Sequence, residues 1–310
     1  MARKIIFDTD PGVDDTMALT FALRSPELEV VGVTSVFGNA AGAVTAQNAL
    51  RLVELEGNGH IPVARGADNG IVIPAIELAS EVHGKDGMGN TNPPAPKGKL
   101  LDIPAAQFIV ETVLANPGEI TLVPVGPLSN IGLALRLEPK IAELVDEVIL
   151  MGGAAYTPGN ITPLAEANIY HDPHAAQMVF SAGWQVTMVG LDATHQVVMD
   201  NAHFDKIFAA DNPAVNLLRE ITPCYRSFFD EVYGLGGAVY THDPSAVAYA
   251  IDPELFEVKK APIVMETEGK CMGKTIPDEE NRWVNYRPTN ICVGGKTDRI
   301  IDLIVERLTK

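Results

Sequence analysis

Short apolar runs rich in β-branched residues alternate with segments of helical periodicity along nearly the whole chain. The strand-like runs span residues 5–7, 30–36, 120–125, 147–151, 186–191 and 289–293, and the helix-like segments span residues 16–23, 43–56, 105–114, 128–137, 173–182, 212–232, 244–251 and 299–308. Strands that are joined through helices pair in parallel, and the helices then cover both faces of the sheet. The alternation predicts an α/β fold with an open, mainly parallel, Rossmann-like sheet. We expect the active site at the carboxyl ends of its strands, where such sheets bind ligands.

The chain has 310 residues, of which 46% are apolar, and can bury a large core. No internal repeat or linker interrupts the alternation, so we expect a single domain over residues 1–310. No apolar run is long enough to span a membrane, and the N-terminus lacks the hydrophobic stretch of a signal peptide. The three cysteines, Cys224, Cys271 and Cys292, match neither a disulfide framework nor a zinc-binding spacing. These features favour a cytoplasmic protein.

The chain carries a formal net charge of −17. Proteins that bind nucleic acids through the phosphate backbone need clusters of Lys and Arg, so this charge argues against a nucleic-acid partner. It also disfavours polyanionic substrates. A neutral or cationic small molecule is the expected ligand, with no membrane partner.

Four carboxylates crowd the turn between the first strand-like run and the first helix-like segment: Asp8, Asp10, Asp14 and Asp15. Like charges this close repel one another, and desolvating them is costly without a counter-charge. A hard divalent cation supplies that charge and prefers oxygen ligands. Helix capping would explain one or two of these residues. Four of them predict a metal-carboxylate active site.

Polar groups also follow other predicted strands. Asn39 follows residues 30–36, Val125 ends residues 120–125 and offers a backbone carbonyl, and Met151 opens a loop that contains Asn160, Glu166 and Asn168. Local explanations exist for several of them, since Asn stabilises turns and an Asp before a Pro caps helices, as at Asp243. Taken singly, His83 and His242 are weak signals, and His171 and His195 are expected to be structural or surface residues.

The combination of motifs is more specific than any one of them. The segment Asp-Thr-Asp-Pro-Gly-Val-Asp-Asp at residues 8–15 resembles the signature of the nucleoside hydrolases, especially the inosine-uridine-preferring group. The resemblance continues in order through residues 38–39, 83–84, 126–130, 151–153, 166, 168, 187–192 and 242–249. It implies hydrolysis of the N-glycosidic bond of ribonucleosides to ribose and free base.

The resemblance also implies roles for individual residues. Ca²⁺ would be bound by the carboxylates of Asp10, Asp15 and Asp243 and by the Val125 carbonyl, with the ribose diol and a water completing its shell, while Asp8 orients the loop. Substrate would be bound by Asp14, Asn39, His83, Met151, Asn160, Glu166 and Asn168, with Tyr225 and Phe229 facing the base. Family members are commonly dimers or tetramers, so a homodimer or homotetramer is expected.

The chemistry of N-riboside cleavage fits these residue types. The reaction passes through an oxocarbenium-like state, which carboxylates stabilise. Asp10 is the expected catalytic base that takes a proton from the attacking water. The resemblance implies that His242 is the catalytic acid that protonates the leaving base, with Tyr225 as an alternative, and the pKa of histidine suits this role.

Two departures from the family pattern leave the base preference open. Ala167 lies between Glu166 and Asn168, where an aromatic residue is frequent, and Phe229 occupies a position where broad-specificity relatives tend to have tyrosine. Phe229 can stack on a base but cannot donate a hydrogen bond, and Tyr233 lies one turn further along. We expect a broad inosine/uridine preference, with a pyrimidine-restricted hydrolase as the alternative.

Two other classes of protein remain open. The Asp8-Thr9-Asp10 segment after an apolar strand also suggests a haloacid-dehalogenase-like phosphatase with Asp8 as nucleophile. That pattern expects Thr or Val where this chain has Gly12, and it leaves Asp14 and Asp15 unexplained. A non-catalytic, Ca²⁺-dependent nucleoside-binding protein is the third possibility, although the candidate base and acid are both present.

Overall fold

The central feature of the computed structural model, which describes residues 2–75 and 79–310, is an eight-stranded sheet. Its strands follow the order β3-β2-β1-β4-β5-β6-β12-β9, and only β9 is antiparallel to its neighbour. The bounds are β1 (Arg3–Thr9), β2 (Leu28–Ser35), β3 (Val63–Arg65), β4 (Ile120–Pro124), β5 (Val145–Met151), β6 (Val186–Val189), β9 (Phe256–Ala261) and β12 (Thr289–Gly295). The first six strands have the Rossmann order, so the predicted α/β fold with a mainly parallel sheet is confirmed.

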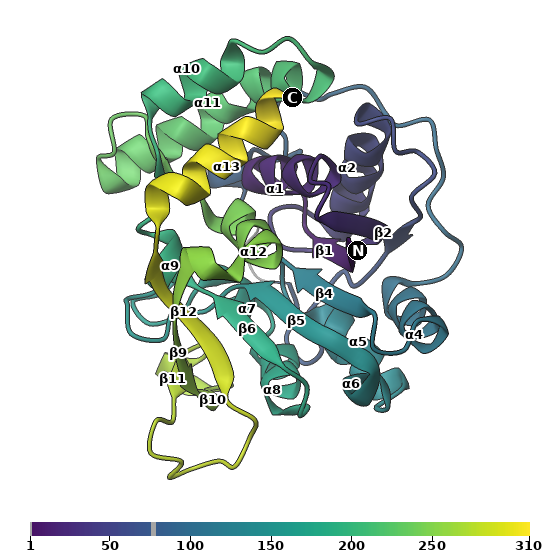
Figure 1. The fold of residues 1–310 in the computed structure, drawn as a ribbon, viewed down its shortest axis with the longest axis vertical. Helices are drawn as coiled ribbons and strands as arrows, with labels where there is room; N and C mark the ends of the chain where they lie inside the picture. Colours follow the sequence, from purple (N-terminus) through teal and green to yellow (C-terminus); the bar gives the residue numbers. More distant parts are fainter. Residues whose placement is uncertain (1, 76–78) are drawn as a thin grey trace.

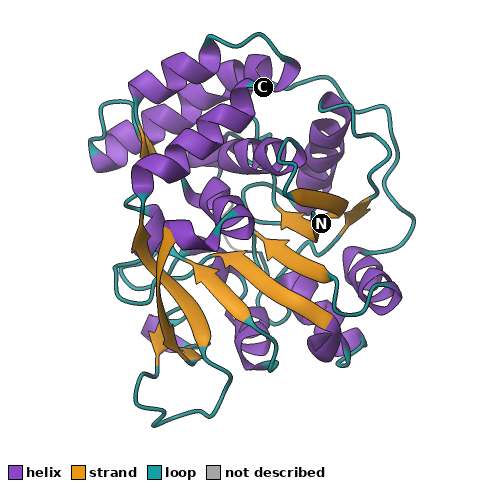
Figure 2. Ribbon diagram, in the orientation of Figure 1, coloured by secondary structure: helices purple, strands orange, loops and turns teal. Residues whose placement is uncertain are grey.

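Helices cover both faces of this sheet (Figures 1 and 2). One face packs against α1 (Val13–Leu23), α2 (Gly42–Leu55), α10 (Asn201–Phe208), α11 (Pro213–Tyr233), α12 (His242–Ile251) and α13 (Thr297–Thr309). The other packs against α4 (Ala105–Ala115), α5 (Ser129–Leu137), α6 (Ile141–Leu144) and α8 (Pro173–Ser181). Successive side chains of a strand point to opposite faces, and accordingly Ile5 and Phe7 lie in one apolar cluster while Ile6 lies in the other.

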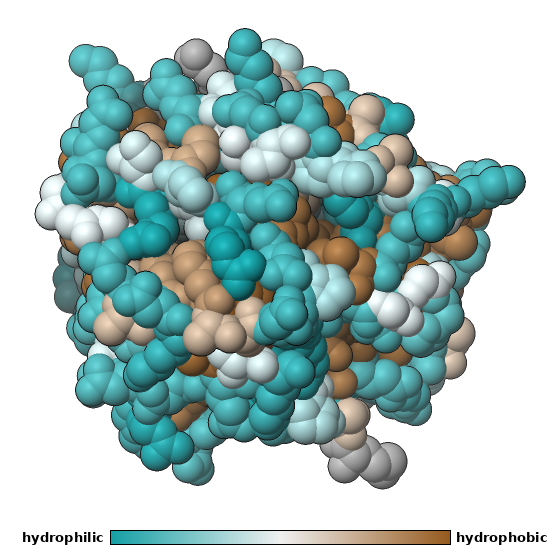
Figure 3. Space-filling view, turned by 90° about the horizontal axis from the view of Figure 1, so that it is seen from above, coloured by the Kyte–Doolittle hydropathy of each residue, from teal (hydrophilic) through white to brown (hydrophobic). Residues whose placement is uncertain are grey.

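Short elements complete the fold. They are α3 (Ser80–His83), α7 (Ala167–His171), α9 (Leu191–Thr194), two 3₁₀ turns (Pro253–Leu255 and Gly269–Cys271), the pair β7 (Val198–Met199) with β8 (Val239–Tyr240), and the pair β10 (Ile263–Met265) with β11 (Thr275–Pro277). Hydrophilic residues cover most of the face seen in Figure 3, as the net charge leads one to expect. No helix in the described part of the chain is long and apolar enough to cross a membrane.

Some predicted boundaries were wrong. The strand expected over residues 186–191 ends at Val189, because Gly190 turns the chain into α9. The helix expected from residue 244 begins at His242, so Thr241 occupies the N-cap and Asp243 lies in the first turn. The capping explanation for Asp243 is therefore wrong. Likewise α1 begins at Val13, which places Asp14 and Asp15 inside its first turn.

The sheet topology brings two polar segments together. In the sheet, β1 lies between β2 and β4. The chain passes from β1 to β2 on one side and later returns to β4 on the other side, so the carboxyl ends of β1 and β4 border a crevice. Asp8 pairs with Pro124 across these strands, and the Val125 N–H donates to the Asp8 carbonyl at 2.8 Å. The acidic turn after β1 thus lies beside Val125.

Candidate active site

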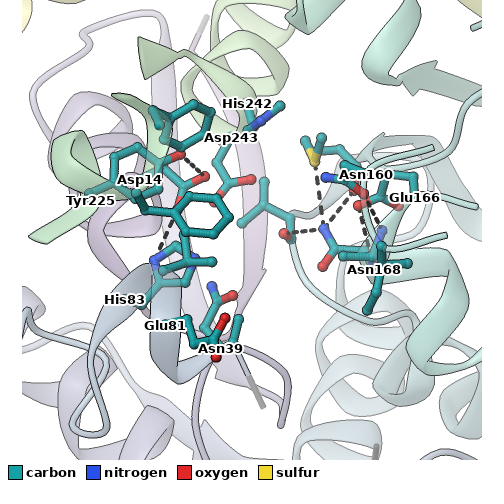
Figure 4. Close-up of a pocket in the computed structure, with 18 of the residues that line it drawn as sticks. Asp14, Asn39, Glu81, His83, Asn160, Glu166, Asn168, Tyr225, His242 and Asp243 are labelled. Carbon is teal, nitrogen blue, oxygen red and sulfur yellow. Dashed lines mark hydrogen bonds and ion pairs between the residues drawn. The ribbon is translucent and has the colours of Figure 1, made fainter. Parts of the chain in front are cut away.

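A pocket of about 320 Å³ opens at this edge of the sheet. That volume lies in the range of small-molecule sites. All the predicted site residues except Asp10 and Asp15 line it: Asp14, Asn39, His83, Val125, Met151, Asn160, Glu166, Asn168, Tyr225, Phe229, His242 and Asp243. Asp10 and Asp15 are buried and do not form its lining. Figure 4 shows Asp14, Tyr225, His242 and Asp243 facing Asn160, Glu166 and Asn168 across the pocket.

The carboxylate of Asp15 is held by the turn around it. It accepts hydrogen bonds from the Thr9 hydroxyl at 2.5 Å and from the Gly12 N–H at 2.9 Å. The side-chain amide of Asn39 donates a further bond at 2.9 Å. Asn39 therefore acts on the acidic turn as well as lining the pocket.

Asp10 has one oxygen bound and one without a partner. Its Oδ2 accepts from the Asn39 N–H at 2.8 Å, while its buried Oδ1 has no hydrogen-bond partner in the described ranges. A Cβ on Gly126 would lie 2.5 Å from Oδ1, which is closer than real Cβ atoms come to other atoms. Glycine at this position is therefore needed to leave room for the Asp10 carboxylate.

Three carboxylates form a compact buried group. One oxygen each from Asp14, Asp15 and Asp243 lie within 4.8 Å of one another. Burial, then the charges of Asp14, Asp15 and Asp10, raise the pKa of Asp243 well above its usual value. Burial and the charge of Asp15 do the same to the pKa of Asp10. A divalent cation would neutralise this repulsion. Buried carboxylate oxygens are a donor set that fits a hard cation, and Oδ1 of Asp10 and Oδ1 of Asp14 have no hydrogen-bond partner among the described residues.

The opposite wall is a set of hydrogen-bonding groups fixed by α7. Glu166 caps this helix, and its carboxylate accepts from the N–H groups of Asn168 at 2.8 Å and Gly153 at 2.9 Å. The side-chain amide of Asn168 donates to the Val125 carbonyl at 2.8 Å. Asn160 accepts from the Ala167 N–H at 3.0 Å. These contacts preorganise polar groups around Val125 before any ligand binds.

Aromatic side chains and two histidines form the remaining wall. The Tyr225 hydroxyl donates to Asp14 Oδ2 at 3.1 Å, and the Tyr225 ring centre lies 4.7 Å from that of Phe229. Burial lowers the pKa of His83 to about 4 and that of His242 to about 3, and the nearby imidazoles of His195 and His83 contribute to the second shift. Tyr225 and Phe229 belong to the core and also line the pocket.

The family model described as inosine-uridine preferring nucleoside hydrolase matches residues 5–302. The chain belongs to this family. The inosine-uridine preferring nucleoside hydrolase of Crithidia fasciculata is 38% identical over 313 residues, covering 100% of this chain and 98% of that protein. Uridine nucleosidase 1 of Arabidopsis thaliana is 36% identical over 318 residues, covering 99% and 94%. A solved plant nucleoside hydrolase has a TM-score of 0.96 at 36% identity, covering 100% of this chain and 99% of that one.

Members of the nucleoside hydrolase family are metal-dependent enzymes that cleave the N-glycosidic bond of ribonucleosides. The predicted family and the predicted enzyme class are therefore confirmed. The buried acidic group provides a place for the metal. The printed names of the relatives differ in the base, so membership does not fix the base preference.

Several residues that line the pocket of this nucleoside hydrolase were not predicted from the sequence: Glu81, Val82, Ile161, His171 and Phe228. Val82 and Phe228 adjoin His83 and Phe229, so sequence neighbourhood alone could have suggested them. His171 was expected to be structural or at the surface; it is buried and lines the pocket three residues after Asn168. His195 is half-buried, with its ring centre 4.4 Å from that of Tyr240.

Asp8 lies beneath the pocket, outside its lining. Its Oδ1 accepts from the Thr34 hydroxyl at 2.5 Å and from the Asn130 amide at 2.7 Å. Burial raises the pKa of Asp8 to about 7, although these two hydrogen bonds oppose the shift. Asp8 thus ties β1 to β2 and to the start of α5.

Proposed function

We propose that this enzyme is a Ca²⁺-dependent hydrolase of purine and pyrimidine ribonucleosides with a broad inosine/uridine preference, acting in nucleoside salvage. The observation that carries the proposal is the buried carboxylate group at one wall of a pocket whose other walls are hydrogen-bonding and aromatic. Such a pocket can hold the metal, the ribose and the base of one nucleoside together. The products are ribose and the free base.

In line with the family resemblance, the metal site is assigned to the carboxylates of Asp10, Asp15 and Asp243 and to the Val125 carbonyl, although the compact group found in the structure has Asp14 in the place of Asp10. Oxygen-only ligation favours Ca²⁺ over softer metals. A bound Ca²⁺ would hold the ribose diol and lower the pKa of a water in its shell. The unpartnered Oδ1 of Asp10 supports its assignment as the base that accepts the water proton.

The ribose is assigned to the polar walls. Asp14, which belongs to the buried carboxylate group, and Asn168 are assigned to the ribose hydroxyls. Asn39, Asn160, Glu166 and Met151 complete the ribose-binding set. Asp14 is oriented by the Tyr225 hydroxyl, and Asn168 by two backbone carbonyls, those of Val125 and Met151. Carboxylates beside the ribose stabilise the positive charge that develops as the glycosidic bond breaks.

The base is assigned to the aromatic wall. Phe229 and Tyr225 pack against it, His83 borders it, and His242 assists its departure. The Tyr225 hydroxyl is already bonded to Asp14, which favours His242 over Tyr225 as the group that assists the leaving base. A pyrimidine-restricted hydrolase is the second candidate, because Phe229 offers no hydroxyl to a purine.

The other classes have less support. A phosphatase with Asp8 as nucleophile would leave the buried group of Asp14, Asp15 and Asp243 unexplained, and the Asp8 carboxylate is already bonded to Thr34 and Asn130. A non-catalytic binder would not need the Asp10 and His242 pair. We further propose that the protein acts as a single-domain, cytoplasmic homodimer or homotetramer on small ribonucleosides, with no nucleic-acid or membrane partner.

The test is a steady-state panel of inosine, adenosine, guanosine, uridine and cytidine, with p-nitrophenyl phosphate as the control substrate. We expect ribose release from inosine and uridine and no phosphate release. Turnover of pyrimidine nucleosides alone would select the second candidate. Tight binding of inosine without ribose release would show that the protein is a nucleoside-binding protein and not an enzyme.

Recognition of the ribose diol gives a separate prediction. A site with buried hydrogen-bonding groups rejects an analogue that lacks the expected hydroxyl by roughly 10⁴-fold or more. The Asp14 carboxylate and the proposed metal are both assigned to the ribose diol. We therefore expect 2′-deoxyuridine to have a kcat/KM lower than that of uridine by about this factor. Equal kcat/KM values for the two substrates would show that the 2′-hydroxyl is not recognised.

A further inference from the structure

His242 contacts one residue that has no assigned role in binding the substrate. The imidazole Nδ1 is 2.8 Å from the hydroxyl oxygen of Thr194, the last residue of α9. Thr194 is fully buried, and it does not line the pocket, whereas His242 does. The two residues are 48 positions apart in sequence, and the folding of α9 against α12 brings them together.

The His242 ring is held in one place by its neighbours. The ring centres of His195, Tyr240 and Phe229 lie 5.7, 6.0 and 6.1 Å from its own. Aromatic rings at these distances pack against the imidazole and limit its rotation. Nδ1 therefore stays beside Thr194, and Nε2 is the ring nitrogen left for the substrate.

The hydroxyl of Thr194 decides which nitrogen carries the proton. A neutral imidazole has one N–H and one acceptor nitrogen, and its partner determines which is which. If Nδ1–H donated to Thr194, the hydroxyl proton would itself need an acceptor, and this hydroxyl has no second hydrogen-bond partner among the described residues. A buried donor without an acceptor is unfavourable. Donation from the hydroxyl to Nδ1 leaves no donor unpaired.

We infer that Thr194 is a positioning residue that donates to Nδ1 of His242 and holds the imidazole in the neutral form with its proton on Nε2. This inference rests on the proposed function, in which His242 assists the departing base. Nε2–H then donates a hydrogen bond to the base as the glycosidic bond breaks. The bonding electron pair goes to the base nitrogen, the water oxygen bonds to the ribose carbon, and its proton goes to Asp10. The released base anion takes a proton from water.

The first test is spectroscopic and needs no substrate. ¹⁵N-histidine NMR of the wild-type enzyme at neutral pH distinguishes a protonated ring nitrogen from an acceptor nitrogen, and the His242 signals are those missing from His242→Gln. We expect Nε2 protonated and Nδ1 unprotonated. A proton on Nδ1, in either the other neutral form or the imidazolium, would overturn the inference.

The second test is kinetic. Thr194→Val keeps the shape of the side chain and removes the hydroxyl, so Nδ1 loses its hydrogen-bond donor and the ring is no longer held with Nε2–H directed at the base. We expect kcat for inosine to fall about 10-fold with little change in KM, because one hydrogen bond to the leaving group is impaired. Hydrolysis of p-nitrophenyl riboside, whose leaving group needs little help, should stay within about 2-fold. Thr194→Ser should restore both the inosine rate and the wild-type NMR signals.

Thr289→Val is the matched control, since Thr289 is a buried threonine on β12 that does not line the pocket. It should retain the wild-type kinetics on both substrates. Equal losses on inosine and p-nitrophenyl riboside in Thr194→Val, or no rescue by Thr194→Ser, would contradict the inference. If the wild type hydrolysed no ribonucleoside, the proposed function would fail, and the NMR result would still report on Thr194.

Discussion

Asp10→Asn should lower kcat for inosine and uridine by at least about 10³-fold, within the range that a lost general base produces. The amide has nearly the shape of the carboxylate but cannot accept the proton of the attacking water, and it is a weaker ligand for a hard cation. Oδ1 of Asp10 is one of the buried carboxylate oxygens that have no hydrogen-bond partner within the described ranges. The measurement is steady-state release of ribose at saturating substrate.

Asp278→Asn is the control for this variant. Asp278 is also a buried aspartate, but it accepts hydrogen bonds from backbone N–H groups of residues 282–284 and does not line the pocket. Its variant should keep the wild-type kcat. An Asp10→Asn enzyme that folds and turns over within about 10-fold of the wild type would rule out Asp10 as the general base.

His242→Ala should lower kcat for inosine by about 10²-fold, since the loss of one hydrogen-bond donor to a developing negative charge typically costs about 10²–10³-fold. The same variant should hydrolyse p-nitrophenyl riboside at close to the wild-type rate, because p-nitrophenolate is a good leaving group. Asp10→Asn should lose both substrates. Comparing the kcat values of Asp10→Asn and His242→Ala on the two substrates thus separates activation of the water from assistance to the leaving base.

His60→Ala, a change at an exposed histidine outside the pocket, is the matched control and should affect neither substrate. Equal slowing of both substrates by His242→Ala would make His242 a structural or ribose-side residue. A mild loss confined to inosine would shift the assisting role to Tyr225, whose hydroxyl would then have to leave Asp14.

The elements that sequence predicts best here are those with long, regular patterns. The run at residues 5–7 alternates between two apolar clusters, and α2 and α11 bury one face each, so hydrophobic periodicity is enough to place them. Helices of four or five residues, such as α3, α7 and α9, are too short to show a period. They were not predicted, although they carry His83, Asn168 and Thr194.

The candidate site was also predicted only in part. The identity and order of the polar residues indicate the family. They also indicate most of the pocket lining, because the carboxyl ends of parallel strands converge. Side-chain direction depends on contacts made after folding. Asn39 bonds to both Asp10 and Asp15 and so helps to hold them beneath the pocket surface, which no spacing in the sequence indicates. Tertiary packing likewise brings His171 into the pocket lining and places Thr194 against His242.

The most direct measurement of the central claim is inosine hydrolysis by enzyme from which divalent ions have been removed with a chelator, followed by addition of Ca²⁺ or Mg²⁺. Metal affinity here requires buried carboxylates to be ionised, and burial, followed by the repulsion of neighbouring carboxylates, raises the pKa of Asp243 and Asp10. We predict that ribose release stops in the metal-free enzyme and returns with Ca²⁺ more fully than with Mg²⁺. Full inosine turnover by the metal-free enzyme would contradict the assignment of this acidic pocket as a metal-dependent active site.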